Sequence, residues 1–334
     1  MSTTMNIAIL GATTLVGEAV LAHLATADMA LGQVYLLGLG EAAGSEVRFK
    51  QQDKPVLEAD GFDFSQVNLA IFAAGAEAAV RYAPIAVAAG CTVIDTSPQF
   101  RQDADVPLVV VGVNESVLTG ASKIIASPCA ISMHLTLSLK SIVSEFGLLS
   151  VTVATYQSVS GSGKVGVDEL AEQTQAIFNL NETENNVYAK RISFNILPQV
   201  GDLMDNGYSA EEIKVIEETR KILSVPELVI NPTAVRVPVF YGHGQAVQIN
   251  TIKPVSVGLA TALWQQQAGL VLVADEEGAP TAVDTVGCDE IFIGRVRTAM
   301  GSAAGLNYWL VADNIHAGPA LNSVRIAGLL GELL

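Results

Sequence analysis

The stretch Ile7-Ala-Ile-Leu-Gly-Ala-Thr-Thr-Leu-Val-Gly17 decides the fold of the amino-terminal half of this chain. A short apolar run leads into Gly11, and apolar side chains then recur at helical spacing. This order predicts a strand, a tight turn and a helix, whose first amides can hold a pyrophosphate. An ordinary packing turn is the alternative, because the full G-x-G-x-x-G pattern is absent and Thr14 stands where glycine would admit a phosphate. The candidate cofactor-binding residues of this turn are Gly11, Thr13, Thr14, Leu15 and Val16.

Short apolar runs continue beyond this turn and indicate a parallel sheet. They lie at Val34–Leu37, Leu69–Ala73, Thr92–Asp95, Leu108–Val111 and Ile124–Ala126, with a helix-like segment at Glu77–Ala89. Runs of this length, separated by helices, are typical of strands that are buried on both faces. Ser127-Pro128 predicts the start of a long helix that reaches about Phe146, since serine caps helices and proline suits their first position.

After Gly147 the pattern changes to a mixture of strands and helices. A strand is expected at 151–156, helices at 168–180 and 210–223, and alternating strands dominate 233–313. An apolar tail at 320–334 predicts a final helix. The second half of the chain is therefore expected to form a domain of a different kind.

Composition narrows the class of function. The chain has 334 residues, enough for two domains, and its 18 basic and 34 acidic residues give a net charge of −16. Such a charge argues against nucleic-acid binding, whereas a small anionic substrate can bind where a few basic groups converge. Three cysteines, Cys91, Cys129 and Cys288, are too few for a disulfide framework. With no signal peptide and no apolar run of about 18 residues, a cytoplasmic protein without a membrane span is expected, and no metal site is predicted.

Several motifs, in order along the chain, resemble those of the aspartate-semialdehyde dehydrogenase family. They lie at Gly11–Gly17, Asp95–Arg101, Asp105–Asn114, Tyr156–Gly161, Glu211–Ile222, Arg236–His243 and Ala312–Asn314. The resemblance is greatest to the Usg-type paralogues of that enzyme, whose own activity it does not establish. It implies an enzyme that converts β-aspartyl phosphate and NADPH to aspartate semialdehyde, phosphate and NADP through a cysteine thioester.

The same resemblance implies the architecture. Residues 1–128 and 315–334 are expected to form a Rossmann-like dinucleotide-binding domain of α/β type. Residues 129–314 are expected to form an α+β catalytic and dimerisation domain with a mixed sheet. A homodimer is implied by the family alone.

The resemblance also implies a set of substrate-binding residues. Arg101 and Lys214 match the family's phosphate ligands, Arg236 its substrate-carboxylate arginine, and Glu211 the residue that holds the substrate amino group. These charges suit those partners, because a guanidinium pairs with a carboxylate and cations pair with phosphate. The alternatives are a solvated loop charge for Arg101 and a helix-face ion pair for Lys214.

His243 and Gln157 match two further functional residues of the family. His243 stands between two glycines, matches the general acid/base, and is expected to titrate near neutral pH and move protons. Gln157 matches the glutamine that orients the thioester. The alternatives are a hydrogen-bonded loop histidine and an inward-facing polar residue at a strand end.

The nucleophile position departs from the family motif Asn-Pro-Asn-Cys-Ser-Thr. Here the chain reads Ser127-Pro128-Cys129-Ala130, so alignment on the proline places Ala130 on the family cysteine. On a helix, an offset of one residue turns a side chain by about 100° and shifts it by about 1.5 Å. Such a shift can cost about a hundredfold in rate. Cys129 remains a candidate nucleophile if the first turn unwinds, and its alternative is a small residue at a helix start.

The cofactor position departs as well. Glu41-Ala-Ala-Gly44 stands where the family carries an Arg-Ser-Ala-Gly stretch that binds the 2′-phosphate of NADP. A carboxylate repels that phosphate and suits a ribose hydroxyl, so Glu41 favours NAD over NADP. Weak or lost dinucleotide binding, with no cofactor, is the alternative.

Three hypotheses follow. The first is a family member with impaired or lost dehydrogenase activity that retains the anion and substrate pocket. The second is an active aspartate-semialdehyde dehydrogenase that uses Cys129. The third is a different reaction in the same pocket, with His243 acting without a covalent thiol.

Overall fold

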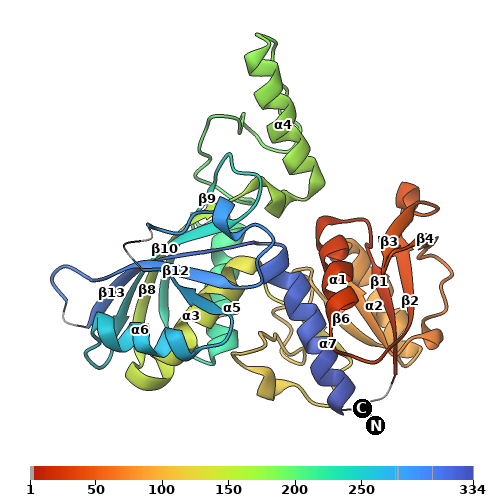
Figure 1. The fold of residues 1–334 in the computed structure, drawn as a ribbon, viewed down its shortest axis with the longest axis horizontal. Coiled ribbons are helices and arrows are strands. Elements are labelled where there is room, and N and C mark those ends of the chain that lie inside the picture. The colour runs from red at the N-terminus through yellow and green to blue at the C-terminus, as the bar shows by residue number, and fades with distance from the viewer. Residues whose placement is uncertain (1–3, 275, 277, 303, 334) are drawn as a thin grey trace. The chain divides into compact units, whose positions relative to one another are not determined.

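The computed structural model of the protein describes residues 4–274, 276, 278–302 and 304–333 and divides into two compact units. Unit 1 comprises Met1–Cys129 and Gly318–Leu334, and unit 2 comprises Ala130–Ala317. We predicted domain boundaries after residues 128 and 314. In the structure the two units divide after residues 129 and 317. The expected pair of a Rossmann-like unit and a mixed-sheet unit is confirmed (Figure 1).

Unit 1 is a doubly wound sheet with helices. Its elements are β1 (Met5–Leu10), α1 (Leu15–Thr26), β2 (Leu31–Gly38), β3 (Glu46–Phe49), β4 (Gln52–Glu58), β5 (Leu69–Phe72), α2 (Ala76–Ala88), β6 (Thr92–Asp95), β7 (Ile124–Ala126) and α7 (Leu321–Leu333). The sheet order is β3-β4-β2-β1-β5-β6-β7, and every pairing except β3 with β4 is parallel. The strand order reverses between β1 and β5, which is where ligands bind in such sheets.

The apolar runs of unit 1 form its core, as their uniform hydrophobicity predicts. All four residues of β5 and of β6 are buried. Helix α2 covers the sheet with Tyr82 and its alanines, which pack against Phe64 and Phe72. Helices α1 and α7 pack against each other.

One predicted strand of unit 1 is wrong. Leu108, Val109 and Val110 are buried as expected and Val111 is half-buried, but the segment makes only an isolated bridge from Leu108 to Ala126. Side-chain amides satisfy its backbone instead. Asn114 accepts from the Val110 amide and donates to the Leu108 carbonyl, while Asn322 bonds the Val111 amide and the Val109 carbonyl. Buried backbone groups need partners, and here two asparagines supply those that Ala126 of β7 does not.

Unit 2 is built on a six-stranded mixed sheet. Its elements are α3 (Ala130–Phe146), β8 (Leu148–Gln157), α4 (Lys164–Phe178), α5 (Ala210–Leu223), β9 (Val229–Arg236), β10 (His243–Thr251), α6 (Val257–Gln266), β11 (Leu270–Leu272), β12 (Ile291–Thr298) and β13 (Gly305–Ala312). The order is β11-β12-β13-β10-β8-β9, with parallel pairs at β11 and β12 and at β8 and β9. Helix α3 contacts α5, α6 and the central strands.

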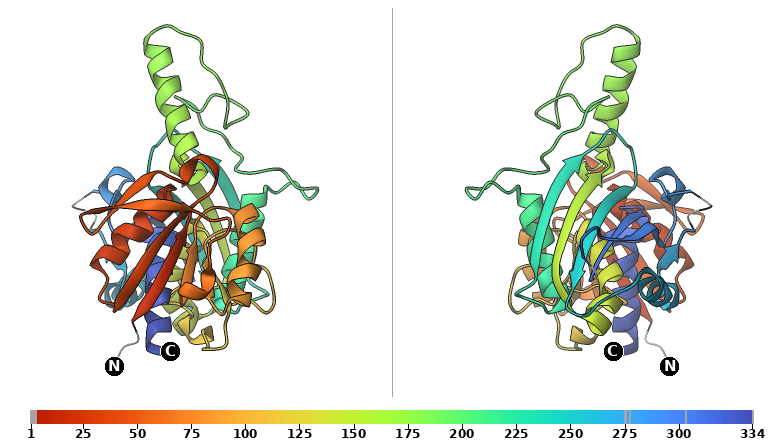
Figure 2. Two further views of the ribbon diagram at one scale, coloured as in Figure 1. Left: turned by 90° about the vertical axis from the view of Figure 1, so that its right-hand side faces the viewer. Right: turned by 90° about the vertical axis from the view of Figure 1, so that its left-hand side faces the viewer.

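Helix α4 extends away from the sheet of unit 2, as Figures 1 and 2 both show. Its base is held by a small apolar cluster of Val159, Leu170 and Ile192. Its far end exposes large apolar side chains, with Phe178 75% and Leu180 95% exposed. Among the helices of the described ranges, none is long and apolar enough to cross a membrane.

Candidate active site

Gln157 and Arg236 lie side by side because β8 and β9 are parallel neighbours that end together. The side chain of Arg236 is 5% exposed, and its guanidinium donates a hydrogen bond to the Ser158 carbonyl at 2.7 Å. The guanidinium carbon also lies 6.0 Å from the ring centroid of Tyr188. Burial lowers the pKa of Arg236 from its ordinary value, and the phenol of Tyr188 and the carboxylate of Glu211 oppose that change.

Glu211 and Lys214 reach this place from the first turns of α5. Ser209 caps the helix in a reciprocal pair with Glu212, whose other carboxylate oxygen accepts a hydrogen bond from the Ala234 amide of β9. This bond ties the start of the helix to the strand. Glu211 then accepts hydrogen bonds from Gln157 at 3.4 Å and from Lys214 at 3.3 Å. The helix-face pair that we named as the alternative for Lys214 is therefore present.

His243 begins β10, which is the other neighbour of β8. Its Nδ1 accepts a hydrogen bond from the Ser158 amide at 3.1 Å, and the hydroxyl of Ser158 lies at the same distance. Gly161 lies against both His243 and Arg236. A Cβ on this glycine would lie 2.7 Å from a guanidinium nitrogen and 3.3 Å from His243 Nε2. Five of the predicted site residues are thus brought together in unit 2.

The titration that we expected for His243 near neutral pH does not fit this environment. The imidazole is buried, and burial is the largest cause that holds its pKa well below the usual value. The charge of Arg236 and the neighbouring His134 lower the pKa further, while a backbone bond to Gly242 opposes them weakly. His243 is therefore neutral in the folded chain at neutral pH.

Sequence reasoning missed the polar groups that hold His243. Asn314 Oδ1 accepts hydrogen bonds from the hydroxyls of Ser158 and Ser160 and from the Gly242 amide, at 3.0–3.1 Å. The three motifs that contain these residues all matched the family, but none of the patterns indicates that the groups meet. Tyr188 was missed as well, and its loop is held by the carboxylate of Glu169, which accepts from the amides of 186–188.

Arg101 belongs to unit 1, whereas its expected phosphate partner Lys214 belongs to unit 2. Arg101 is 6% exposed, so its interpretation as a solvated loop charge is wrong. Its guanidinium donates to the Thr96 carbonyl at 2.6 Å, within the motif that begins at Asp95. Burial raises the pKa of the Asp95 carboxyl to about 6, although hydrogen bonds from Ser97 and the charge of Arg101 oppose the rise.

Cys129 is a half-buried residue that immediately precedes α3. The predicted helix start at Ser127-Pro128 is two residues too early. The Ser127 amide still donates to the Asp95 carbonyl of β6, at 2.8 Å, and its hydroxyl accepts from Asn322, so this residue extends the sheet of unit 1. The rotation of about 100° between neighbouring side chains of a helix therefore applies from Ala130 onward. It does not describe the direction of the Cys129 side chain, because Cys129 lies before the helix.

The turn from Gly11 to Gly17 fits a dinucleotide. Gly11 has a φ of +88°, and a Cβ there would lie 2.7 Å from the Ala73 backbone at the end of β5. Thr14 caps α1 by accepting from the Gly17 amide, and its hydroxyl lies 2.9 Å from the Gly11 carbonyl. The next amides, at Leu15 and Val16, belong to the first helical turn, which leaves N–H groups available for an anion. Thr14 therefore caps the helix start, at the position where a glycine would let the backbone approach a phosphate more closely.

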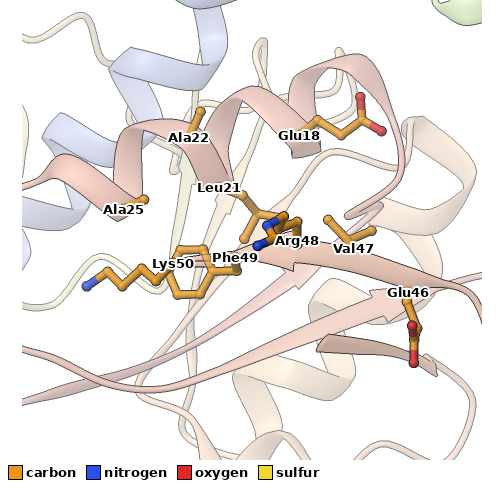
Figure 3. Close-up of a pocket in the computed structure, with 9 residues that line it drawn as sticks. All are labelled: Glu18, Leu21, Ala22, Ala25, Glu46, Val47, Arg48, Phe49 and Lys50. Carbon is orange, nitrogen blue, oxygen red and sulfur yellow. The ribbon is translucent and has the colours of Figure 1, made fainter. Parts of the chain in front are cut away.

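Unit 1 also contains the predicted cofactor residue Glu41 and a separate pocket. Glu41 is exposed in a short 3₁₀ turn, Gly40–Ala42, just beyond the end of β2. A separate open pocket of about 390 Å³ lies between α1 and β3, with Leu21 and Phe49 among its lining residues (Figure 3). None of the predicted site residues lines this pocket.

Comparison with known proteins gives a consistent result over the whole chain. The family profile for the semialdehyde dehydrogenase NAD-binding domain matches residues 6–121, and the profile for the semialdehyde dehydrogenase dimerisation domain matches residues 139–317. The aspartate-semialdehyde dehydrogenase of Shewanella violacea is 41% identical, over 99% of this chain and 98% of its own length. That of Legionella pneumophila is 42% identical, with 99% and 96% covered. The structure of aspartate-semialdehyde dehydrogenase II of Vibrio cholerae, complexed with ASA, superposes with a TM-score of 0.96 at 41% identity, covering 99% of both chains.

Proposed function

The chain belongs to the aspartate-semialdehyde dehydrogenase family, and from that membership we propose that it is an active, NAD(P)-dependent enzyme of this kind. It would interconvert aspartate semialdehyde and β-aspartyl phosphate, with phosphate and the dinucleotide as co-substrates. The observation that carries the proposal is the convergence of Arg236, Glu211, Gln157 and His243 in unit 2. A guanidinium beside a carboxylate suits the two charged ends of an amino acid.

We assign the substrate contacts by charge. Arg236 would pair with the substrate carboxylate and Glu211 with its ammonium group. Phosphate contacts are assigned to Lys214 in unit 2 and to Arg101 in unit 1, because each offers a cation that can bind phosphate in a chain of net charge −16. Because Arg236 is buried, its ion pair with a bound carboxylate would be shielded from water and stronger than a surface pair.

The chemistry assigned to the chain is acyl transfer through a thiol. In the oxidative direction the Cys129 thiolate would attack the aldehyde carbon, and loss of hydride from the adduct would leave a thioester. Phosphate would then displace the thiol and release β-aspartyl phosphate. When bound at the turn of Gly11, a nicotinamide dinucleotide supplies the hydride acceptor. Gln157 would orient the thioester, and His243 would bond to its oxygen or to the sulfur.

Ligand binding without turnover is a second candidate function, favoured by one observation at the nucleophile. Aligned on Pro128, the family cysteine falls on Ala130, which is the first residue of α3 and carries no nucleophile. Glu41 in place of the family arginine favours the same hypothesis. This chain would then keep the substrate site and lose the reaction.

Reduced nicotinamide absorbance separates the two functions. The full-length chain is incubated with aspartate semialdehyde, phosphate and either NAD or NADP. Turnover that is lost in Cys129→Ala and kept in Cys288→Ala supports the enzyme, because Cys288 is a second half-buried thiol outside the proposed site. No turnover with either cofactor, together with heat released on titration of aspartate semialdehyde, supports binding alone.

We infer a homodimer from the dimerisation-domain match and from the exposed end of α4. Phe178 and Phe194 stack edge to face there, with ring centroids 5.9 Å apart, although both side chains are mostly exposed. An apolar group of this kind is typical of a surface that a second copy covers. Sedimentation velocity tests the inference, and a single species with the mass of one chain at micromolar concentration contradicts it.

A further inference from the structure

The hydrogen bond between the Ser158 amide and His243 has only one possible direction. A backbone amide can only donate, so the bond from the Ser158 amide requires a lone pair on His243 Nδ1. Turning the ring over would present a carbon to this amide and lose the bond. In the neutral imidazole the proton must then lie on Nε2, and that nitrogen lies on the side of Gly161 and Arg236.

Asn314 fixes the two segments that form this contact. The Gly242 amide donates to its side chain at 3.0 Å, which identifies the accepting atom as oxygen and not the amide nitrogen. The same oxygen accepts from the hydroxyls of Ser158 and Ser160. Asn314 therefore joins the residue before His243 to the loop that carries its partner, and its own side chain is 3% exposed.

A second proton on His243 would have to enter at Nδ1, where it would face the Ser158 amide hydrogen. The other titratable or charged groups near the ring are Arg236 from β9 and His134 from α3, and both oppose a positive charge on it. Burial lowers the pKa of His134 to about 4, so His134 carries the charge that repels a second proton only at acidic pH. Burial, Arg236 and the Ser158 amide therefore favour a neutral ring with a lone pair on Nδ1, and only the backbone bond to Gly242 opposes them.

We propose that Ser158 and Asn314 are positioning residues that hold His243 as its Nε2–H tautomer, so that this side chain acts as a hydrogen-bond donor in the resting site. A neutral Nε2–H cannot accept the proton of a thiol. It can stabilise a thiolate or the oxygen of an acyl adduct, as a neutral histidine polarises a carbonyl in triosephosphate isomerase. The proposal rests on the proposed function for its chemical meaning, but the tautomer is a property of the free protein.

Nitrogen-15 NMR of histidine-labelled full-length protein tests the tautomer without any need for turnover. The signal of His243, assigned with a His243→Asn variant, is followed from about pH 5 to 8. We expect a protonated Nε2, a lone pair on Nδ1, and no titration in this range. A protonated Nδ1, or an imidazolium that appears near neutral pH, overturns the proposal. An enzyme without turnover that shows the Nε2–H form would refute the proposed function alone.

Three variants test the positioning residues in the same spectra. Ser158→Ala keeps the amide and should keep the tautomer. Asn314→Asp keeps an oxygen that accepts from Ser158, Ser160 and Gly242. It also adds a negative charge that only the hydroxyl of Ser158 separates from the ring, so the pKa of His243 should rise by about one to three units. Asn250→Asp, at the other end of β10, is the matched control and should leave the pKa unchanged. Equal shifts in the two Asp variants, or no shift in Asn314→Asp, would remove Asn314 from the proposal.

Discussion

The dinucleotide turn of unit 1 and the substrate site of unit 2 are built in different ways. One continuous run, from Gly11 to Gly17, supplies the glycines, the cap and the first helical amides of the turn. The site takes Gln157, Arg236 and His243 from the ends of three strands and two further residues from α5. A change in the turn thus disturbs the backbone, whereas a change in the site removes one contact from an intact fold.

The largest expected effect follows from adding one methyl group to the turn. A Cβ at Gly17 would lie 2.0 Å from the Gly11 carbonyl oxygen, so Gly17→Ala should lower the free energy of unfolding by about 3 kcal/mol or more. Gly328→Ala is the matched control, because that helical glycine of α7 faces open space and should gain up to about 1 kcal/mol. Chemical denaturation measures both. Equal stability of the two variants would contradict the close approach in the turn.

The two units should also respond to pH in opposite directions. In unit 1 the folded-state pKa of Asp95 is raised from 3.8 to about 6, so the folded chain holds the proton more tightly and stability falls as pH rises through this interval. In unit 2 the pKa of His134 is lowered from 6.5 to about 4, so stability falls as pH drops through that interval. Each effect amounts to about 3 kcal/mol.

Calorimetry of two variants between about pH 4 and 7 separates these effects. Asp95→Asn should remove the loss of stability that accompanies rising pH. His134→Gln should remove the loss of stability that accompanies falling pH. If either variant keeps the pH slope of the unchanged chain, burial of that group does not control its titration.

A smaller effect is expected at Lys214. Its charge has two explanations, which are phosphate binding in the candidate site and the ion pair with Glu211 along the helix. Its side chain is 37% exposed, so its pair with Glu211 contributes at most about 1 kcal/mol to folding. Lys214→Met should raise the KM for phosphate about tenfold, since a cation to phosphate contact is worth about 1.5 kcal/mol or more, with little change in Tm. Lys253→Met removes another lysine of unit 2, and it should change neither quantity. An unchanged KM in Lys214→Met would leave only the helix pair.

The smallest effect is expected at Glu41, which is exposed and therefore well screened. Isothermal titration should show tighter binding of NAD than of NADP. Glu41→Ala should improve NADP binding by up to about fivefold, as removal of one surface repulsion permits. Glu115→Ala, which alters an acidic residue elsewhere in unit 1, should change neither affinity. Tighter NADP binding by the unchanged chain would contradict our interpretation of this residue.

The parts of the fold that were missed carry little local signal. The hairpin of β3 and β4 turns through Lys50 and Gln51, which both have positive φ, yet neither is glycine or asparagine. The Leu108–Val111 segment has the composition of a buried strand, and the side-chain contacts of Asn114 and the distant Asn322 show why it does not form a full one. The start of α3 shifted for the same reason, because Ser127 is bonded to another strand.

From the sequence alone the chain was expected to have a Rossmann-like unit, a second unit with a mixed sheet, and most of the residues that now meet in the candidate site. Apolar periodicity, glycine at a forced turn and motifs in family order are local or linear properties, so they can be read along the chain. Tertiary structure alone decided that Nδ1 of His243 accepts from Ser158, that Asn314 joins their segments, and that the imidazole is neutral. Hydrogen-bond direction and burial depend on residues up to 156 positions apart, and no local pattern encodes which of them meet.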